Sequence, residues 1–294
     1  MKCTLCPRNC GVDRSVGYGY CGEGDEARVS KIMLHHWEEP CISGCEGDAG
    51  SGAIFFSGCP LKCVYCQNRA ISRGGEGDVM TTDRLAKAIL KLQEDGALNI
   101  NFVTPTHFTN RIIEALDLTR GRLSVPVVWN TSGYEKVETL KTLEGYVDVF
   151  LTDFKYASGE ISSKYSSAPD YPETALAALR EMVRITGAPL FDGGMLRRGT
   201  VVRHLVLPGS YRDSIEVLNT VCRAVGTNNV LVSLMAQYTP EFAGSDFPEL
   251  ARRITTFEYS KVLSHAKALG FEGYAQQRGS ASAKYTPDFA PESL

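Results

Sequence analysis

The chain has 294 residues, of which 43% are hydrophobic and 22% are charged, and this composition is typical of a globular protein with a large core. The formal net charge is -3 and the isoelectric point is about 6.0, so neither a nucleic-acid-binding nor a membrane-binding surface is indicated. The sequence has no basic N-terminal stretch followed by an apolar signal core, and no apolar run of about eighteen residues. We therefore expect a cytoplasmic protein whose partners are proteins or small molecules.

Most of the cysteines are concentrated near the N-terminus. Nine of the ten fall between Cys3 and Cys66, and in a reducing compartment this concentration indicates metal or redox ligands rather than a disulfide framework. The tenth, Cys222, is expected to be a buried thiol on a helix.

The first group of cysteines lies among glycines that permit a tight wrap of the backbone. It consists of Cys3, Cys6, Cys10 and Cys21. Four thiolates suit a closed zinc site and an auxiliary Fe-S cluster equally well, and a thiol redox role is a third alternative. We predict that residues 1–28 form a metal-binding module, because so short a segment has too small a core to fold alone. A catalytic domain over 29–280 and a tail over 281–294 follow it.

The next stretch reads KIMLHHWEEPCISG, from Lys31 to Gly44. Its polar residues resemble metal ligands at first sight: His35, His36, Glu38 and Glu39. Pro40 and Gly44 break the segment directly after them, so we interpret them as ordinary polar residues beside a strand and a turn. The roles of Cys41 and Cys45 stay open: they could assist the first module or be inert.

The second group of cysteines lies in FFSGCPLKCVYCQN, directly after a short apolar run. Cys59, Cys63 and Cys66 supply three thiolates within one compact loop. Fe-S clusters are normally held by four thiolates, and a site one protein ligand short leaves a position for a substrate or cofactor. The alternative is a structural zinc loop or a chance clustering of buried thiols.

From Gly52 onward, short β-rich runs alternate with helical patterns, which is typical of βα units and a parallel sheet. Six strands are predicted: 53–56, 99–103, 125–129, 147–152, 200–207 and 230–235. Six helices are predicted, each stopped by a glycine: 82–94, 110–119, 137–143, 172–186, 213–225 and 248–269. A last strand is predicted within 273–278, and the whole arrangement is predicted to be an α/β partial (β/α)6 TIM-like barrel. In such folds the chemistry gathers at the carboxyl ends of the strands.

The residues that follow the predicted strands are polar and specific. They are the cysteine triplet, Thr104 to His107, Asn130 to Gly133, Asp153 to Lys155, Pro208-Gly209 and Gln237-Tyr238. We expect them to meet at one mouth.

The triplet, with an aromatic residue before its last cysteine, resembles the signature of the radical S-adenosylmethionine (SAM) superfamily. The segments HHWEEPCISG, VTPTH, NTSGYE, DFK and RHLVLPG are similar to those of its glycyl-radical-enzyme activase branch, most closely the pyruvate formate-lyase activating-enzyme-like group. The resemblance implies that Cys59, Cys63 and Cys66 bind a 4Fe-4S cluster whose fourth iron is chelated by SAM. It implies further SAM-binding positions: Tyr65, Asn68, Thr104, Thr106, Asn130, Asp153, Lys155 and Gln237.

The resemblance also implies roles for these positions. Tyr65 would lie near the adenine, Asn130 near the ribose and Lys155 near the SAM carboxylate. The segment from Thr104 to Thr106 replaces a Gly-Gly-Glu type segment that holds the SAM amino group in activases, and Gln237 lies where activases carry a histidine. Two further histidines have less certain roles: His107 lies at a strand end without an assigned partner, and His204 lies inside the fifth predicted strand, where a structural role and a SAM contact are equally plausible.

An external one-electron reductant would reduce the cluster, and cleavage of SAM would yield a 5′-deoxyadenosyl radical that abstracts a hydrogen atom. The first candidate for the hydrogen donor is a backbone glycine of a partner glycyl-radical enzyme. The second is a small molecule or a peptide. A third interpretation, from a different class, is a non-catalytic Fe-S electron-transfer protein.

Overall fold

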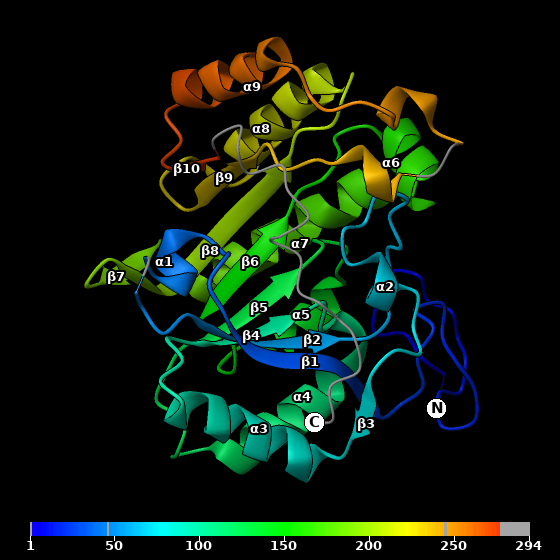
Figure 1. Cartoon of the computed structure of the whole chain (residues 1–294), viewed down its shortest axis with the longest axis vertical. Helices are drawn as coiled ribbons and strands as arrows, with labels where there is room; N and C mark the ends of the chain where they lie inside the picture. The colour runs from blue at the N-terminus through cyan, green and yellow to red at the C-terminus, as the bar shows by residue number, and fades with distance from the viewer. Residues whose placement is uncertain (1, 46, 244–245, 277–294) are drawn as a thin grey trace.

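The computed structural model describes residues 2–45, 47–243 and 246–276, which form a single sheet with helices packed against it (Figure 1). The strands are β1 (Ala27–His35), β2 (Ser51–Phe56), β3 (Asp78–Met80), β4 (Ile100–Val103), β5 (Val127–Thr131), β6 (Val149–Asp153), β7 (Leu190–Asp192), β8 (Met195–Leu205), β9 (Leu231–Met235) and β10 (Gly273–Ala275). The α-helices are α1 (Pro40–Ser43), α2 (Arg69–Ser72), α3 (Thr82–Glu94), α4 (Thr109–Thr119), α5 (Val137–Lys141), α6 (Gly159–Ser166), α7 (Tyr171–Thr186), α8 (Tyr211–Val225) and α9 (Thr256–Leu269).

The six predicted strands form the parallel centre of the sheet, in the order β2-β4-β5-β6-β8-β9. At one edge β10 adds a further parallel strand, with Gly273 opposite Val232. At the other edge β1 pairs antiparallel with β2 and β3. The pairing runs from β10 to β3 without returning to its start, so the sheet is an open partial barrel, as the alternation of strands and helices predicts.

The helices begin and end largely where capping residues predict. Helix α3 begins after Thr81, whose hydroxyl accepts a hydrogen bond from the backbone N–H of Arg84. Helix α9 begins at Thr256 and not at Pro248 as predicted, because Thr255 and Glu258 form a capping box there. The Ser-rich helix α6 was not predicted, since its sequence GEISSKYS lacks a clear apolar period.

The core lies between the sheet and the outer helices. Phe102, Trp129 and Phe150 from three adjacent strands are fully buried in one cluster with Ile89 of α3 and Ile112 of α4. Each βα connection therefore packs its helix onto the sheet and leaves the strand ends free for polar loops.

The N-terminal segment lies against the loop that carries the cysteine triplet. The backbone N–H of Cys59 donates to the carbonyl of Cys21 at 3.2 Å, and the Arg8 Nε donates to the carbonyl of Pro60 at 2.8 Å. Strand β1 begins at Ala27, so the predicted module boundary after residue 28 falls inside that strand. The predicted tail 281–294 and the end of the last predicted strand, beyond residue 276, lie outside the described residues.

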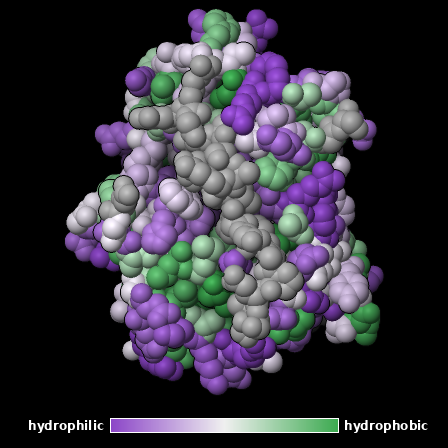
Figure 2. Space-filling model, viewed as in Figure 1, coloured by the Kyte–Doolittle hydropathy of each residue, from purple (hydrophilic) through white to green (hydrophobic). Residues whose placement is uncertain are grey.

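Apolar side chains also reach the surface between β1 and α3. They line a hollow with Ile32, Leu34, Met80 and Leu92 among its walls, and Figure 2 shows hydrophobic residues gathered on the face where these elements lie. Within the described part of the chain, no helix combines the length and the apolar character needed to cross a bilayer.

Candidate functional site at the carboxyl ends of the strands

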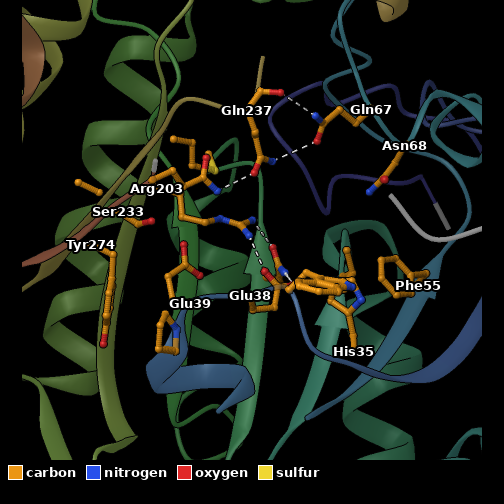
Figure 3. Close-up of a pocket in the computed structure, with 17 residues that line it drawn as sticks. His35, Glu38, Glu39, Phe55, Gln67, Asn68, Arg203, Ser233, Gln237 and Tyr274 are labelled. Atoms are coloured by element: carbon orange, nitrogen blue, oxygen red, sulfur yellow. Dashed lines mark hydrogen bonds and ion pairs between the residues drawn. The ribbon is translucent and has the colours of Figure 1, made fainter. Parts of the chain in front are cut away.

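Two adjoining cavities open at the carboxyl ends of the parallel strands. The inner one, here the cysteine cavity, has a volume of about 210 Å³ and is lined by Cys59, Cys63, Tyr65, Cys66, Asn68, Thr104, Asn130, Asp153, Lys155 and Gln237, among others. The outer one, here the glutamate chamber, has a volume of about 370 Å³ and is lined by His35, Trp37, Glu38, Glu39, Phe55, Ser233 and Tyr274, among others (Figure 3). The two share a wall that includes Asn130, Arg203 and Gln237, so they form one continuous mouth.

The cysteine triplet lies on a tight loop after β2. Gly58 precedes it with a φ of 79°, and a Cβ atom there would approach the carbonyl oxygen of Cys21 to 2.8 Å, so the turn requires glycine. Cys63 Sγ accepts a hydrogen bond from the Ser166 hydroxyl at 3.1 Å, and Cys59 Sγ accepts one from the backbone N–H of Leu61 at 3.4 Å. Donors to sulfur are among the groups that tune Fe-S centres.

The donor set fits an iron–sulfur cluster. Burial raises the pKa of the Cys59 thiol to about 12, with the neighbouring Cys63 and Cys66 adding to the effect, so a bound metal would be needed to hold it as a thiolate. Among the described residues, no three His, Cys, Asp or Glu side chains converge as ligands of a single ion. A 4Fe-4S cluster takes its thiolates on separate irons, and three thiols along one cavity wall suit that larger group.

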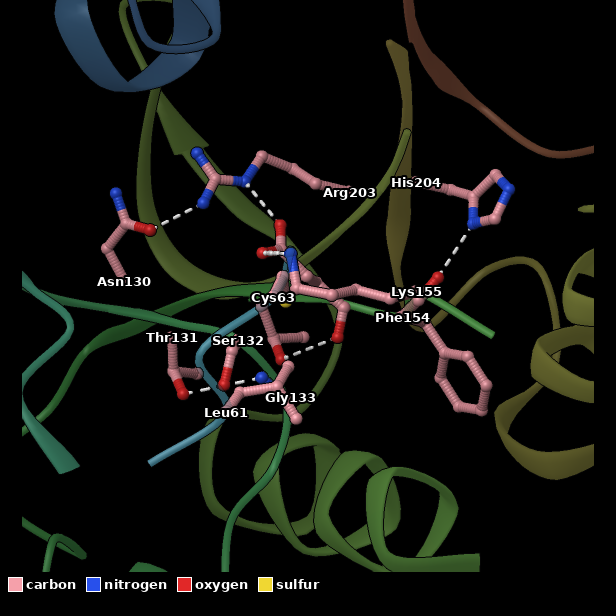
Figure 4. Close-up of polar contacts among 12 residues, drawn as sticks. Leu61, Cys63, Asn130, Thr131, Ser132, Gly133, Phe154, Lys155, Arg203 and His204 are labelled. Carbon is pink, nitrogen blue, oxygen red and sulfur yellow. Dashed lines mark hydrogen bonds and ion pairs between the residues drawn. The ribbon is translucent and has the colours of Figure 1, made fainter. Parts of the chain in front are cut away.

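A buried polar network centred on Arg203 forms the wall between the two cavities (Figure 4). The Arg203 Nη1 lies 2.9 Å from Glu38 Oε2, and its Nε lies 3.1 Å from Asp153 Oδ1. Its Nη2 donates to Asn130 Oδ1 at 2.5 Å. Asp153 Oδ2 in turn lies 2.6 Å from Lys155 Nζ. The guanidinium therefore holds residues from β1–α1, β5 and β6 in one arrangement.

The charged members of the network stabilise one another. Burial alone would raise the pKa of Asp153, but Lys155 and Arg203 together hold it below its usual value. Burial alone would lower the pKa of Lys155, but Asp153, Cys63 and Cys66 keep it above its usual value. The ammonium of Lys155 is therefore charged at neutral pH and faces the same cavity as the cysteines.

Glu38 lies beside the turn after β1, as interpreted from the sequence, and it also belongs to this network. Its Oε1 accepts from Asn130 Nδ2 at 2.9 Å and from Asn101 Nδ2 at 3.1 Å. The turn between β1 and α1 carries it over the strand ends, a placement that depends on the antiparallel pairing of β1 with β2. His35, at the end of β1, packs edge-on against Phe55, and burial lowers its pKa.

A chain of hydroxyl groups fixes the aromatic residue of the triplet. The Tyr65 and Tyr156 hydroxyls lie 2.6 Å apart, and the Tyr156 hydroxyl lies 2.8 Å from Ser166 Oγ, which donates to Cys63. Burial raises the pKa of Tyr65 well above its usual value, so the phenol stays neutral. The ring is held in one position beside the cysteine cavity.

Comparison with known proteins decides the family. The sequence profile of the radical SAM superfamily matches residues 53–221, which include the cysteine triplet and the first five predicted strands. The chain belongs to the radical SAM superfamily. It is 30% identical over 276 residues to the uncharacterized protein MJ0674 of Methanocaldococcus jannaschii, covering 90% of this chain and 74% of that protein. It is 21% identical over 308 residues to the uncharacterized protein MJ0808 of the same organism, covering 93% and 83%.

Solved structures of radical SAM proteins share the fold at low sequence identity. SuiB of Streptococcus suis, bound to its precursor peptide SuiA, superimposes with a TM-score of 0.51 at 10% identity over 74% of this chain. The chain spans only 46% of SuiB. A spore photoproduct lyase variant with bound AdoMet and dinucleoside spore photoproduct has a TM-score of 0.51 at 14% identity, covering 80% of this chain and 78% of that one.

In this radical SAM protein most of the predicted SAM-binding residues come together. Those that line the cysteine cavity are Tyr65, Asn68, Thr104, Asn130, Asp153, Lys155 and Gln237. Thr106 is not brought to it: its side chain is buried and its hydroxyl donates to Glu135 Oε1 at 2.7 Å. The neighbouring Thr104 has a φ of 58°, a conformation in which a β-branched residue is strained.

The two histidines near the strand ends are structural. The Nε2 of His107 lies 2.6 Å from the Ser57 carbonyl, and Arg14 of the N-terminal segment hydrogen-bonds the His107 carbonyl. The Nδ1 of His204 lies 2.7 Å from the Phe154 carbonyl. Burial lowers the pKa of His107 to about 3 and that of His204 to about 4, so both are neutral near pH 7. Neither lines the cavities.

The remaining cysteines have different surroundings. In the N-terminal segment Cys6 and Cys21 are buried and Cys3 and Cys10 are half-buried, and burial raises the pKa of Cys6 to about 12. Away from that segment, Cys41 packs in an apolar cluster beside Val149, whereas Cys45 is exposed. Cys41 therefore behaves as a core thiol.

Three charged residues that line the mouth were not among the predicted site residues: Glu38, Glu39 and Arg203. A signal for Arg203 was present, since a charged residue inside the apolar strand VVRHL is rarely buried without a partner. The two glutamates stood out in the sequence as possible ligands, but their placement over the strand ends depends on the turn that follows β1.

Proposed function

We propose that this radical SAM protein is an enzyme that binds a 4Fe-4S cluster through Cys59, Cys63 and Cys66, and SAM beside it in the cysteine cavity. The observation that carries the proposal is that three thiols and a charged lysine line one cavity. When bound, the cluster and SAM supply one-electron cleavage to methionine and a 5′-deoxyadenosyl radical. An external reductant provides the electron.

The residues around the cavity would bind and orient SAM. The ammonium of Lys155, held in place by Asp153, suits the SAM carboxylate. Asn130 is locked between Glu38 and Arg203, so its position near a ribose would be pre-set before SAM arrives. Tyr65, fixed by Tyr156, would pack beside the adenine.

The loop after β4 would contact the SAM amino group, and the backbone conformation of Thr104 supports this proposal. Its left-handed backbone is the conformation that glycine adopts readily, and the resemblance to activases expects a glycine-rich segment here. Thr104 thus adopts a glycine-like conformation although it is not a glycine. The acidic member of that segment has no counterpart, because Thr106 turns into the core toward Glu135.

We propose a small molecule or a peptide as the hydrogen donor, in preference to a glycine of a partner enzyme. The glutamate chamber of about 370 Å³ adjoins the cysteine cavity and is of the size of a small-ligand pocket. SuiB, of similar fold, is bound to a precursor peptide in its structure. A glycyl-radical-enzyme partner is less favoured because Gln237 replaces the histidine of the activases and bridges Gln67 and Gln276. A non-catalytic electron carrier would have no use for this polar network.

The test is anaerobic turnover. Protein reconstituted with iron and sulfide, then supplied with dithionite and SAM, should release 5′-deoxyadenosine. Cys63→Ala should abolish this release, whereas Cys222→Ala, which changes a thiol on α8, should not. If the EPR spectrum of the reduced cluster does not change when SAM is added, the proposal is wrong. A radical on a glycine of an added partner protein would restore the activase assignment.

We also propose that Cys3, Cys6, Cys10 and Cys21 bind either zinc or a second Fe-S cluster. The support is that two of these thiols are buried and that the segment contacts the cluster loop through Cys21. Iron, sulfide and zinc analysis of anaerobic protein against a Cys3→Ala/Cys6→Ala variant distinguishes the two metals. Equal metal contents in both proteins would refute a metal role.

A further inference from the structure

The glutamate chamber contains one carboxyl group with an unused oxygen. Glu39 is only 8% exposed, and its Oε2 has no hydrogen-bond partner. Ser233 lines the same chamber, and Figure 3 shows Glu39 and Ser233 on the same side of it. A buried polar atom without a partner is costly, so its presence on a cavity wall points to a group that arrives with a ligand.

The charges around Glu39 favour a cation. Arg203 and Lys155 are balanced by Glu38 and Asp153, each within 3.1 Å of its partner. Glu39 is outside these pairs. Burial raises the pKa of Glu39 above its usual value and Arg203 only partly opposes this, so a cation placed beside the carboxyl group would stabilise its ionised form. Burial keeps the pKa of His35 below its usual value, so this histidine is uncharged at neutral pH. Among the described residues, Glu39 is therefore the carboxyl group of the chamber wall that has no ion-pair partner, whereas Glu38 has Arg203.

The rest of the wall suits an aliphatic stem that ends in an ammonium. Three aromatic side chains line the chamber: Trp37, Phe55 and Tyr274. Aromatic rings pack against methylene groups and attract cations over their faces. Trp37 is 59% exposed and so lies at the entrance.

We propose that the glutamate chamber is the substrate subsite of this enzyme, and that Glu39 binds a protonated primary amine carried on an aliphatic stem. The inference rests on the proposed function, because the chamber becomes a substrate subsite only if SAM is cleaved in the adjoining cysteine cavity. The amine could belong to a lysine side chain of a peptide or to a free alkylamine, which present the same chemistry.

Binding can be tested without turnover. Ligand-observed NMR titrations on the reconstituted, SAM-bound protein without reductant would compare 1-aminopentane with 1-pentanol and pentanoate. We expect the amine to bind about tenfold more tightly than the alcohol, as expected for a hydrogen bond to a charged group, and pentanoate to bind most weakly. Nα-acetyl-lysine amide and Nα-acetyl-norleucine amide distinguish a peptide source from a free amine.

Variants then assign the effect to the chamber. Glu39→Gln keeps the shape and removes the charge, so the preference for the amine over the alcohol should disappear. Glu181→Gln is the matched control, because Glu181 is also 8% exposed but lies on α7 away from both cavities. Trp37→Ala removes an exposed ring and should weaken amine binding several-fold even if Glu39→Gln fails to fold.

Equal affinity for amine and alcohol in the wild-type protein, or an amine preference that survives Glu39→Gln, would refute the subsite. Because 5′-deoxyadenosine release is measured separately, SAM cleavage without amine preference would refute the subsite alone. Amine preference in a protein that never cleaves SAM would refute the proposed function, and the chamber would then be an amine-binding site that is not a substrate subsite.

Discussion

Replacing Arg203 by methionine tests whether the polar network holds the site together. Arg203 has a side-chain exposure of 15%, and its partners Glu38 and Asp153 have exposures of 9% and 13%. Removing one member of a buried ion pair costs about 3–5 kcal/mol of unfolding free energy, because the partner charge stays buried without compensation. Glu38 keeps two amide donors and Asp153 keeps Lys155, so we expect the lower end, about 3 kcal/mol.

The assay is urea unfolding of the apoprotein at pH 7, with the shift in midpoint converted through the slope of the transition. Arg184→Met is the control: Arg184 pairs with Glu144 and Glu181 but is 49% exposed, so its loss should shift the urea midpoint far less than Arg203→Met does. Combining Arg203→Met with Glu38→Gln should recover part of the loss, since the uncompensated carboxylate is removed. A loss below about 1 kcal/mol for Arg203→Met alone would refute the reasoning.

Three further predictions concern the cofactor site and its supports. Lys155→Met should weaken SAM binding by about tenfold or more, because a charged hydrogen-bond donor is lost; isothermal titration calorimetry measures the affinity. Lys141→Met on α5 is the control and should leave the affinity unchanged. Equal SAM affinities of the Lys155→Met variant and the wild-type protein would show that Lys155 does not belong to the SAM site. Gly58→Ala should lower the iron content after reconstitution, because Gly58 has a φ of 79° and a Cβ atom there would lie 2.8 Å from the carbonyl oxygen of Cys21. Gly121→Ala is the control: Gly121 has a φ of 77°, but no atom lies within 4 Å of the position of an added Cβ. This variant should lose stability without losing iron. Burial lowers the pKa of His204 from its usual 6.5 to about 4 in the folded protein, so unfolding takes up a proton between these pH values. The free energy of unfolding should therefore fall as pH falls through this window, by up to about 1.4 kcal/mol per pH unit. His204→Gln should flatten this part of the plot of urea midpoint against pH, and an unchanged slope would contradict the prediction.

The cysteine spacing predicted the superfamily without knowledge of the fold, and the family profile confirmed it. Cys59, Cys63 and Cys66 lie close together in the sequence, so the loop that they form can be recognised without knowing how distant segments pack. The polar residues that follow each apolar run are recognised in the same way. The strand and helix positions were equally accessible, since alternation and glycine stops are local signals: α3 spans the predicted residues 82–94. Parallel strands then bring their carboxyl ends to one edge, which is why seven of the predicted SAM-binding residues line one cavity.

The ion pairs between distant residues could not be predicted from the sequence. Glu38 and Arg203 are 165 residues apart in the chain, and they meet because β1 pairs antiparallel on β2 while β8 lies in the centre of the sheet. The inward turn of Thr106 toward Glu135 depends likewise on a short helical turn after β4. Periodicity and spacing report local conformation, whereas burial and ion pairing depend on which segments pack together. The cofactor could therefore be predicted from the sequence, while the chamber beside it, with Glu39 on its wall, required the fold.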